Sequence, residues 1–582
     1  MNSTTAKDFL ANLRDRIEIG ADGKFRLPGI LTQKELDALD FFIAEQKARV
    51  EPQTVVTAPS PDAPAAFKGI ANRALEAKIP APVTESELAP EPEPDITLDL
   101  SSLELPETSA DHRVCLDFGT AMSKATFVHD DDDIEDIRVL KLGIPGDQEE
   151  IDENMLVSSV FIDTEGLLWF GQKAVEQSVA VTEGEHARMD NIKRALSEGN
   201  LDEALDAKFN PTRQRLTYED IVLAYLSFFT WTINNALQAE EVAVAPNVRR
   251  RFAMPCFPRA NARLVEAKLK VLLGEAQMLA DTFGHTIHQG LPLSHFLAAL
   301  RQLRAEPRSY PFIEGSVTEP LGVAGSLLSW KSKHDSLTLV VDIGAGTSDF
   351  SLYRLHVADD PDGRIRASAG EVDATARGIT EAGNHLDKIL MAYILKRSGV
   401  NASHPLYINI THALERDIRH HKEELFTTGS VVVVLYTNDT VEISLADFMA
   451  LDAVGAFELS LRTTLEAILN DADREWIEWI RINPARFLTI VLTGGGATLP
   501  MVKKLAEGTV TAHGITVRVA AAKSFPNWLQ EDYPDLEEAY PRIAVSLGGA
   551  RKNIIRPMSS PLTTTASGIS GHTLARFPIS GN

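Results

Sequence analysis

Two segments of the sequence, 225 residues apart, share one pattern of apolar, acidic, glycine and hydroxyl residues. The first reads VCLDFGTA at residues 114–121, and the second reads VVDIGAGTSD at residues 340–349. In each, an apolar run ends in an aspartate, a glycine-containing turn follows, and an alternating second run begins. This pattern predicts a β-hairpin whose tip is built from small residues. One such turn alone is most often a plain hairpin, but two in one chain are a much stronger signal.

The residues at the two predicted tips are suited to binding phosphate. Glycine lets backbone N–H groups come close to phosphate oxygens, and a threonine adds a hydroxyl group. An aspartate at the end of a strand can hold a hydrated magnesium ion, because Mg²⁺ gives up its waters reluctantly. We therefore expect Asp117 and Asp342 to hold Mg²⁺. The predicted phosphate-binding residues are Gly119, Thr120, Ala121, Gly344, Gly346 and Thr347.

A third glycine-rich segment, FLTIVLTGGGATLP at residues 487–500, completes the set. An apolar strand-like run leads into Gly494, Gly495 and Gly496, and a helix is predicted to begin near Pro500. Because glycines have no side chains, a flat adenosine could lie directly on this backbone. Taken alone, the triplet is more typical of a flexible loop.

Composition excludes several classes of function. The chain has 57 Lys and Arg against 82 Asp and Glu, a formal net charge of −25, which argues against a general nucleic-acid binder. The two cysteines rule out a disulfide framework and a four-thiolate zinc site. No run of about 18 apolar residues exists, and no apolar signal core begins the chain. We expect a cytoplasmic protein with no membrane and no nucleic-acid partner.

The first 110 residues differ from the rest. Residues 1–50 hold two amphipathic stretches at helical spacing, which predict a small helical docking module. Residues 51–110 contain 10 of the 30 prolines, 11 acidic residues and three basic ones. Such a composition buries too little apolar surface to fold, so it predicts a disordered acidic linker. From about residue 111 to residue 553 strand-like and helix-like runs alternate, which is typical of an α/β protein. Residues 552–582 are expected to form a flexible tail.

The three glycine segments, in this order, resemble those of the actin-like ATPase superfamily, and most closely the seventy-kilodalton heat-shock chaperones of the DnaK type. Residues 190–196 (DNIKRAL) are similar to that family's helix with the catalytic lysine, and TEP at 318–320 is similar to its Asn-Glu-Pro. Residues 379–387 (ITEAGNHLD) resemble its Gly-Gly-Glu-Asp-Phe-Asp segment. The resemblance covers about residues 111–551.

The resemblance implies a fold and a set of roles. The fold would be a two-lobed actin-like ATPase with duplicated ribonuclease-H-like subdomains and a nucleotide cleft, lobe I at 111–337 and lobe II at 338–551. Lys193 would stabilise the transferring phosphate, Glu319 would position water, and Asp342 would act with them. Gly383, from the segment at 379–387, and Lys422, from the stretch that resembles the adenosine-clamping helix, would join the glycine triplet in binding ATP or ADP with Mg²⁺.

The sequence also departs from the family. Glu423 and Thr498 stand where arginines that contact the base are usual, and Arg542 replaces an acidic residue. About 25 residues between Leu273 and Phe312 exceed the family pattern. After Ala550 only 32 residues remain, so the peptide-binding domain of the chaperones is expected to be absent.

These observations predict a slow Mg-dependent ATPase that switches conformation for a protein partner, recruited by the N-terminal module and the lobe surfaces. Two alternatives stay open. One is an actin-like filament or scaffold protein, and the other is a nucleotide-binding pseudo-enzyme.

Overall fold

A computed structural model gives the fold of the chain, which divides into two compact units at residues 1–90 and 91–582. The structure describes residues 18–19, 25–26, 94–131, 134–144, 153–179, 186–239, 245–257, 259–329, 333–359, 365–552 and 556–557. In the first unit it describes one antiparallel pair, β1 (Glu18–Ile19) with β2 (Phe25–Arg26). The predicted helices of residues 1–50, most of the linker and most of the tail lie outside the described residues.

The first large sheet is built around the first predicted hairpin. Its strand order is β11-β9-β3-β4-β5, and β6 pairs with β4 beside this path. β3 is parallel to β9 and antiparallel to β4, so β3 lies at the centre of the sheet. The strands are β3 (His112–Asp117), β4 (Met122–Asp131), β5 (Ile134–Val139), β6 (Leu156–Val157), β9 (Arg249–Met254) and β11 (Ile313–Thr318).

The second large sheet repeats this strand order around the second hairpin. Its core path is β20-β18-β12-β13-β14, with β12 parallel to β18 and antiparallel to β13. β19, β15 and β21 add to its margins. The strands are β12 (His334–Ile343), β13 (Ser348–Asp359), β14 (Ile365–Glu371), β15 (Arg377–Ile379), β18 (Leu488–Thr493), β19 (Thr509–Ala512), β20 (Ile515–Ala521) and β21 (Arg556–Pro557). The mixed α/β class predicted from the sequence is thus confirmed.

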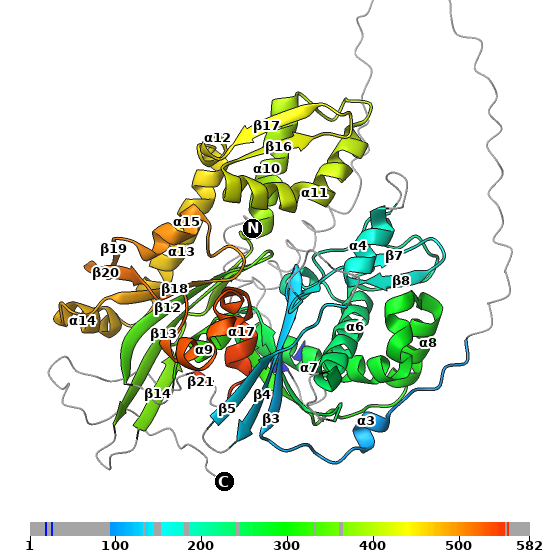
Figure 1. Cartoon of the computed structure of the whole chain (residues 1–582), viewed down its shortest axis with the longest axis horizontal. Coiled ribbons are helices and arrows are strands. Elements are labelled where there is room, and N and C mark those ends of the chain that lie inside the picture. The colour runs from blue at the N-terminus through cyan, green and yellow to red at the C-terminus, as the bar shows by residue number, and fades with distance from the viewer. Residues whose placement is uncertain are drawn as a thin grey trace, which may run out of the picture. The chain divides into compact units, whose positions relative to one another are not determined.

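Two helices, α9 (Glu319–Leu327) and α17 (Tyr540–Ala550), lie between the two sheets (Figure 1). α9 packs on β12 and β13, α17 packs on β3 and β4, and the two helices pack on each other. At their glycines the two backbones are too close to admit a side chain. A Cβ atom at Gly548 would lie 1.8 Å from the carbonyl oxygen of Gly322. The four layers therefore join the two hairpin sheets into one body.

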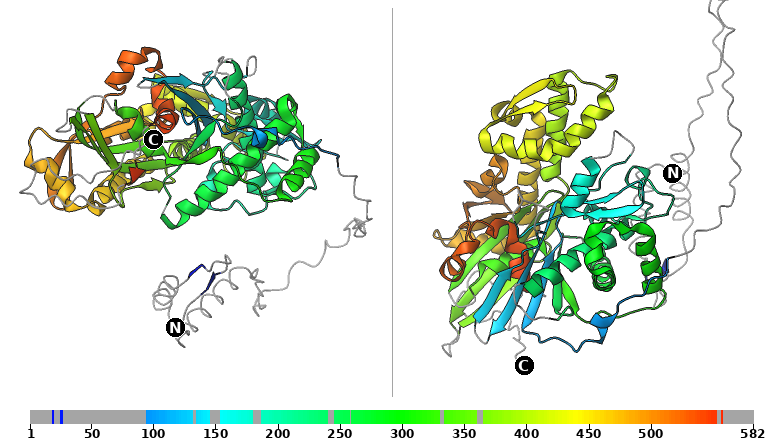
Figure 2. Two further views of the ribbon diagram at one scale, coloured as in Figure 1. Left: turned by 90° about the horizontal axis from the view of Figure 1, so that it is seen from below. Right: turned by 45° about the vertical axis from the view of Figure 1, so that its right-hand side comes forward.

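Further helices and small sheets surround the two large sheets (Figure 2). Around the first sheet these are α3 (Ser101–Glu104), α4 (Gly171–Val179), α5 (Arg194–Glu198), α6 (Tyr218–Ala239), α7 (Arg259–Phe283), α8 (Leu293–Arg304), and the sheet of β7 (Val160–Ile162), β8 (Leu167–Phe170) and β10 (Leu291–Pro292). Around the second they are α10 (Gly383–Ser398), α11 (Tyr407–Thr428), α12 (Leu445–Met449), α13 (Asp452–Asp471), α14 (Arg474–Ile482), α15 (Pro500–Lys503), α16 (Asn527–Asp532), and the pair β16 (Ser430–Val434) and β17 (Thr440–Ser444). Short 3₁₀ helices cover residues 207–209, 284–289, 504–506 and 534–536.

The end of the predicted linker is folded. Within residues 94–110, helix α3 packs on α7, and Ser102 is buried with its hydroxyl donating to Asp281 at 2.5 Å. Apolar side chains at every second position from Ile96 to Leu100 also contact the core. The predicted boundary at residue 110 is therefore wrong. The averaged proline and acid content of residues 51–110 concealed these few apolar residues.

Two further details of the first half differ from or extend the sequence expectations. Lys193 occupies the position immediately before α5, and its side chain makes no capping hydrogen bond, so it does not lie within the predicted helix. The extra residues after Leu273 lengthen α7 and add β10 and α8. Arg304 ties α8 to the body through ion pairs with Glu219 and Glu275. In the described part of the chain, no helix is long and apolar enough to cross a membrane.

A charge cluster at the start of β12 makes stability depend on pH. Burial alone would raise the pKa of Asp335, but His356 and Arg354 outweigh it and lower that pKa to about 2 from its ordinary 3.8. The carboxylate therefore stabilises the fold above pH 4, and this contribution is lost as the pH falls towards 2. Because the side chain is 42% exposed, we expect Asp335→Asn to cost only about 1 kcal/mol at pH 7.

Urea unfolding of both proteins between pH 7 and pH 2.5 checks this prediction. The difference between wild type and Asp335→Asn should shrink across the lower part of that range. A difference that stays constant down to pH 2.5 would contradict the lowered pKa.

Candidate functional site

The two predicted hairpins form, and in each the predicted aspartate is paired with the residue seven positions later, Asp117 with Lys124 and Asp342 with Asp349. In the second, the N–H of Gly344 donates to the carbonyl oxygen of Thr347 at 2.9 Å. In the first, a Cβ atom at Gly119 would lie 1.9 Å from the carbonyl oxygen of Met122, so only glycine fits this position. β3 ends at Asp117, and β12 ends one residue after Asp342. The two aspartates therefore lie at equivalent edges of the two sheets.

The tips of the two hairpins face each other. A Cβ atom at Gly346 would lie 2.8 Å from the hydroxyl oxygen of Thr120, which shows that the tips are in contact. Next to this contact, the side-chain amide of Asn384 at the start of α10 donates to Asn191 at 2.7 Å. Residues from both halves of the body therefore meet at one place, between the ends of β3 and β12.

Four carboxylates gather at this place. Asp117, Glu319, Asp342 and Asp349 are each at most 9% exposed. Burial, followed by the charges of Glu319, Asp349 and Asp117, raises the pKa of Asp342 well above its ordinary value. Burial and Glu319 also raise the pKa of Asp349, although that carboxylate accepts the N–H of Cys256 at 2.7 Å. The hydrogen bonds that these carboxylates accept do not fully compensate their negative charge.

Two lysines lie in the same cluster. The ammonium group of Lys193 donates to Glu319 in a buried ion pair. Burial by itself would lower the pKa of Lys193, but Glu319 and Asp117 outweigh it and raise that pKa. Lys124, on β4, pairs with Asp117 across the hairpin with Nζ 3.5 Å from Oδ2. Both ammonium groups thus face the carboxylates between the hairpins.

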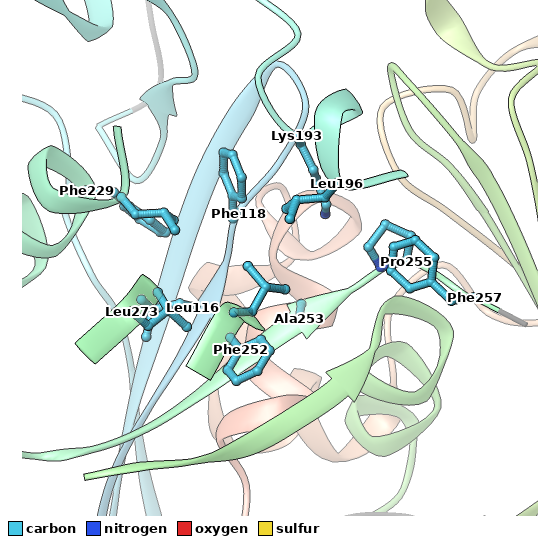
Figure 3. Close-up of a pocket in the computed structure, with 12 residues that line it drawn as sticks. Leu116, Phe118, Lys193, Leu196, Phe229, Phe252, Ala253, Pro255, Phe257 and Leu273 are labelled. Carbon is cyan, nitrogen blue, oxygen red and sulfur yellow. The ribbon is translucent and has the colours of Figure 1, made fainter. Parts of the chain in front are cut away.

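An apolar wall holds the alkyl chain of Lys193 in position (Figure 3). Lys193 is the only charged residue among those that line this narrow cavity. The others are Leu116, Phe118, Leu196, Leu226, Phe229, Phe252, Ala253, Pro255, Phe257, Leu269 and Leu273. Because an apolar lining excludes water, the ammonium group is directed to Glu319 and its charge acts in a medium of low dielectric constant.

The third glycine segment flanks the end of β12. The N–H of Gly496 donates to the carbonyl oxygen of Ile343 at 2.9 Å, and Gly494 adopts a φ of +81° that favours glycine. A Cβ atom at Gly494 would lie 2.3 Å from the carboxylate of Asp342. Gly495 is exposed beside them, with open space where its Cβ would be. The turn therefore presents bare backbone next to the carboxylate cluster.

The segment around Gly383 flanks the other side of the second hairpin. The N–H of Gly383 donates to the carbonyl oxygen of Gly344 at 3.0 Å. Lys422, on α11, donates to the carbonyl oxygen of Gly383 at 3.2 Å and pairs with Asp387 at 2.8 Å. The next residue, Glu423, points away and pairs with Arg419 on the surface. Of Lys422 and Glu423, it is thus Lys422 that contacts the segment around Gly383.

The structure brings together the residues predicted at the hairpins, at Lys193, at Glu319, at Lys422 and in the glycine triplet. Sequence reasoning missed the role of Lys124 in the cluster. The hairpin register could have found it, because Asp117 and Lys124 are opposite each other and cross-strand partners point to one face. The contact between Asp349 and the backbone of Cys256 had no such signal.

Among the described residues, no group of three or more His, Cys, Asp or Glu side chains is arranged to hold a metal ion directly. The chain matches no protein-family model and no curated protein sequence.

Proposed function

We propose that this protein binds a nucleoside triphosphate, ATP, together with Mg²⁺ between its two hairpins, and hydrolyses it slowly. One observation carries this proposal: equivalent hairpins of two sheets with the same strand order meet tip to tip, with four buried carboxylates around them. Ligands of α/β sheets bind outside the carboxyl ends of the strands, which is where this cluster lies.

The residues present fit a hydrated magnesium ion. Mg²⁺ prefers oxygen ligands and keeps several waters, so two facing carboxylates can hold it without a full protein cage. Asp117 and Asp342 would hold the ion, and the negative charges of Glu319, Asp349 and Asp117 around Asp342 favour it. When bound, the ion would neutralise the charge of the terminal phosphates.

The remaining residues divide between binding and chemistry. The N–H groups of both tips, with Thr120 and Thr347, would cradle the phosphates, and Lys193 would stabilise charge on the transferred phosphoryl group. Glu319, paired with Lys193, would orient the attacking water. Gly494–Gly496, Gly383 and Lys422 form the part of the site that would face the nucleoside.

The strand order also supports the finer fold proposal, an actin-like ATPase related to the DnaK-type chaperones. In both sheets the second strand along the chain separates the first from the third, and the fourth and fifth lie beyond the first, as duplicated ribonuclease-H-like units require. α9 and α17, packed between the sheets, give such units a common hinge. We propose that nucleotide state changes the angle at this hinge and is read by a protein partner.

Isothermal titration with ATP, ADP and GTP, with and without Mg²⁺, tests the proposal. Asp342→Asn should weaken Mg-ATP binding at least about tenfold, because it removes a negative charge that would hold the Mg²⁺ ion. Asp417→Asn, a surface carboxylate of α11 paired with Arg416, is the matched control and should bind as wild type does. If wild type binds none of the nucleotides, or if Asp342→Asn binds equally well, the proposal is wrong.

A further inference from the structure

Lys124 occupies a place in the carboxylate cluster that the proposed function does not yet use. It is the residue of β4 directly opposite Asp117 of β3. Its Nζ lies 3.5 Å from Oδ2 of Asp117, and the two side chains are 17% and 7% exposed. The ammonium group is therefore largely removed from solvent and is held at the end of the strand beside a predicted metal residue.

The charges around Lys124 are unequally compensated. The other ammonium group of the cluster, that of Lys193, already pairs with Glu319. Lys124 is therefore the lysine whose ammonium group pairs with Asp117. Its positive charge also acts on Asp342, across the contact between the two hairpin tips. Lys124 thus stands in the field of the same two carboxylates that would hold a divalent cation.

A cation and a lysine that share two carboxylates work against each other. An incoming Mg²⁺ is repelled by the ammonium group and finds Asp117 already paired, which lowers its affinity. An incoming phosphate is attracted by the same ammonium group. At about 4 Å, one unit charge changes the binding constant of another roughly fivefold in water, and by more than tenfold where water is excluded.

We propose that Lys124 compensates part of the negative charge of the site. With this lysine present, triphosphate binding depends less on Mg²⁺ than it would with the four carboxylates alone. This inference rests on the proposed nucleotide binding. It makes Lys124 a specificity-determining residue, because it sets the balance between free ATP and Mg-ATP at the hairpins.

The test compares wild type with Lys124→Met, which keeps the length of the side chain and removes its charge. The dissociation constant of ATP is measured in EDTA and in excess Mg²⁺. For wild type we expect the dissociation constant in EDTA to exceed that in Mg²⁺ by less than about tenfold. For Lys124→Met we expect the ratio of these two constants to be at least about tenfold larger than for wild type. Mg²⁺ titrated alone should bind Lys124→Met about tenfold more tightly, seen as heat or as a larger rise in melting temperature.

Two variants separate charge from structure. Lys124→Arg keeps the charge and should behave as wild type does in both titrations. Lys504→Met removes an exposed lysine that pairs with Glu458, and it should change neither ratio. The melting temperature of each variant without ligand shows that it is folded.

The outcomes distinguish this inference from the proposed function. If nucleotide binds but wild type and Lys124→Met show the same Mg²⁺ dependence and the same Mg²⁺ affinity, the role of Lys124 is refuted while nucleotide binding stands. If wild type binds no nucleotide with or without Mg²⁺, the proposed function fails and the inference fails with it.

Discussion

Replacing Lys193 with methionine is expected to lower the free energy of unfolding by about 3–5 kcal/mol. The substitution leaves Glu319 buried without its partner, next to Asp342 and Asp349, whose charges it repels. Methionine fits the apolar wall that holds the lysine chain, so the loss comes from charge and not from a cavity. Urea unfolding at pH 7 measures it.

The double variant Lys193→Met/Glu319→Gln separates stability from chemistry. Neutralising Glu319 removes the unpaired charge, so at least half of the lost stability should return. If the proposed function holds, hydrolysis of ATP should instead stay at least about 100-fold below wild type, since the charge that we propose stabilises the transferred phosphoryl group is still missing. An unchanged urea midpoint in Lys193→Met would show that the pair does not stabilise the fold, and recovery of turnover in the double variant would exclude the catalytic assignment.

The substitution Gly548→Ala should separate α9 from α17 and cost at least about 2 kcal/mol, in spite of alanine's higher helix propensity. The added methyl carbon would lie 1.8 Å from the carbonyl oxygen of Gly322 and 2.6 Å from the N–H nitrogen of Ser326. Both neighbours are backbone atoms, which cannot turn away as a side chain can. The whole helix must shift, and the contact between the two sheets loosens with it.

Gly455→Ala provides the matched control for this prediction. Gly455 is also helical, in α13, but a Cβ atom there would meet nothing within 4 Å. We expect this variant to gain up to about 1 kcal/mol, because alanine loses less backbone entropy on folding. If the two variants shift the melting temperature in the same direction and by similar amounts, the close packing of α9 on α17 does not limit stability.

Local pattern was sufficient for the hairpins. Asp117 and Asp342 end apolar runs, and the residues after them allow only a tight turn, so their surroundings follow from about ten neighbouring residues. The same holds for the turn at Gly494, which follows a buried strand and precedes Pro500 at the start of α15. Alternation of strand and helix patterns gave the α/β class for the same reason.

Contacts between residues far apart in the sequence could not be predicted from local pattern. The ion pair of Lys193 with Glu319 joins residues 126 positions apart, whereas that of Lys124 with Asp117 could have been read from the hairpin register. The packing of residues 94–110 on α7 rests on four apolar side chains scattered in an acidic, proline-containing stretch. Averages over a window conceal such residues, and their effect appears only when the opposite surface is known.

The sequence by itself determined where the chain turns and which chemical groups stand at each turn, because those depend on backbone conformation and on neighbours along the chain. Only the tertiary structure decided that the two turns touch, that four carboxylates share two ammonium groups between them, and that Gly322 and Gly548 let α9 and α17 meet. The reason is physical: charge and close packing act over distances in space, and residues far apart in sequence supply both sides of each contact.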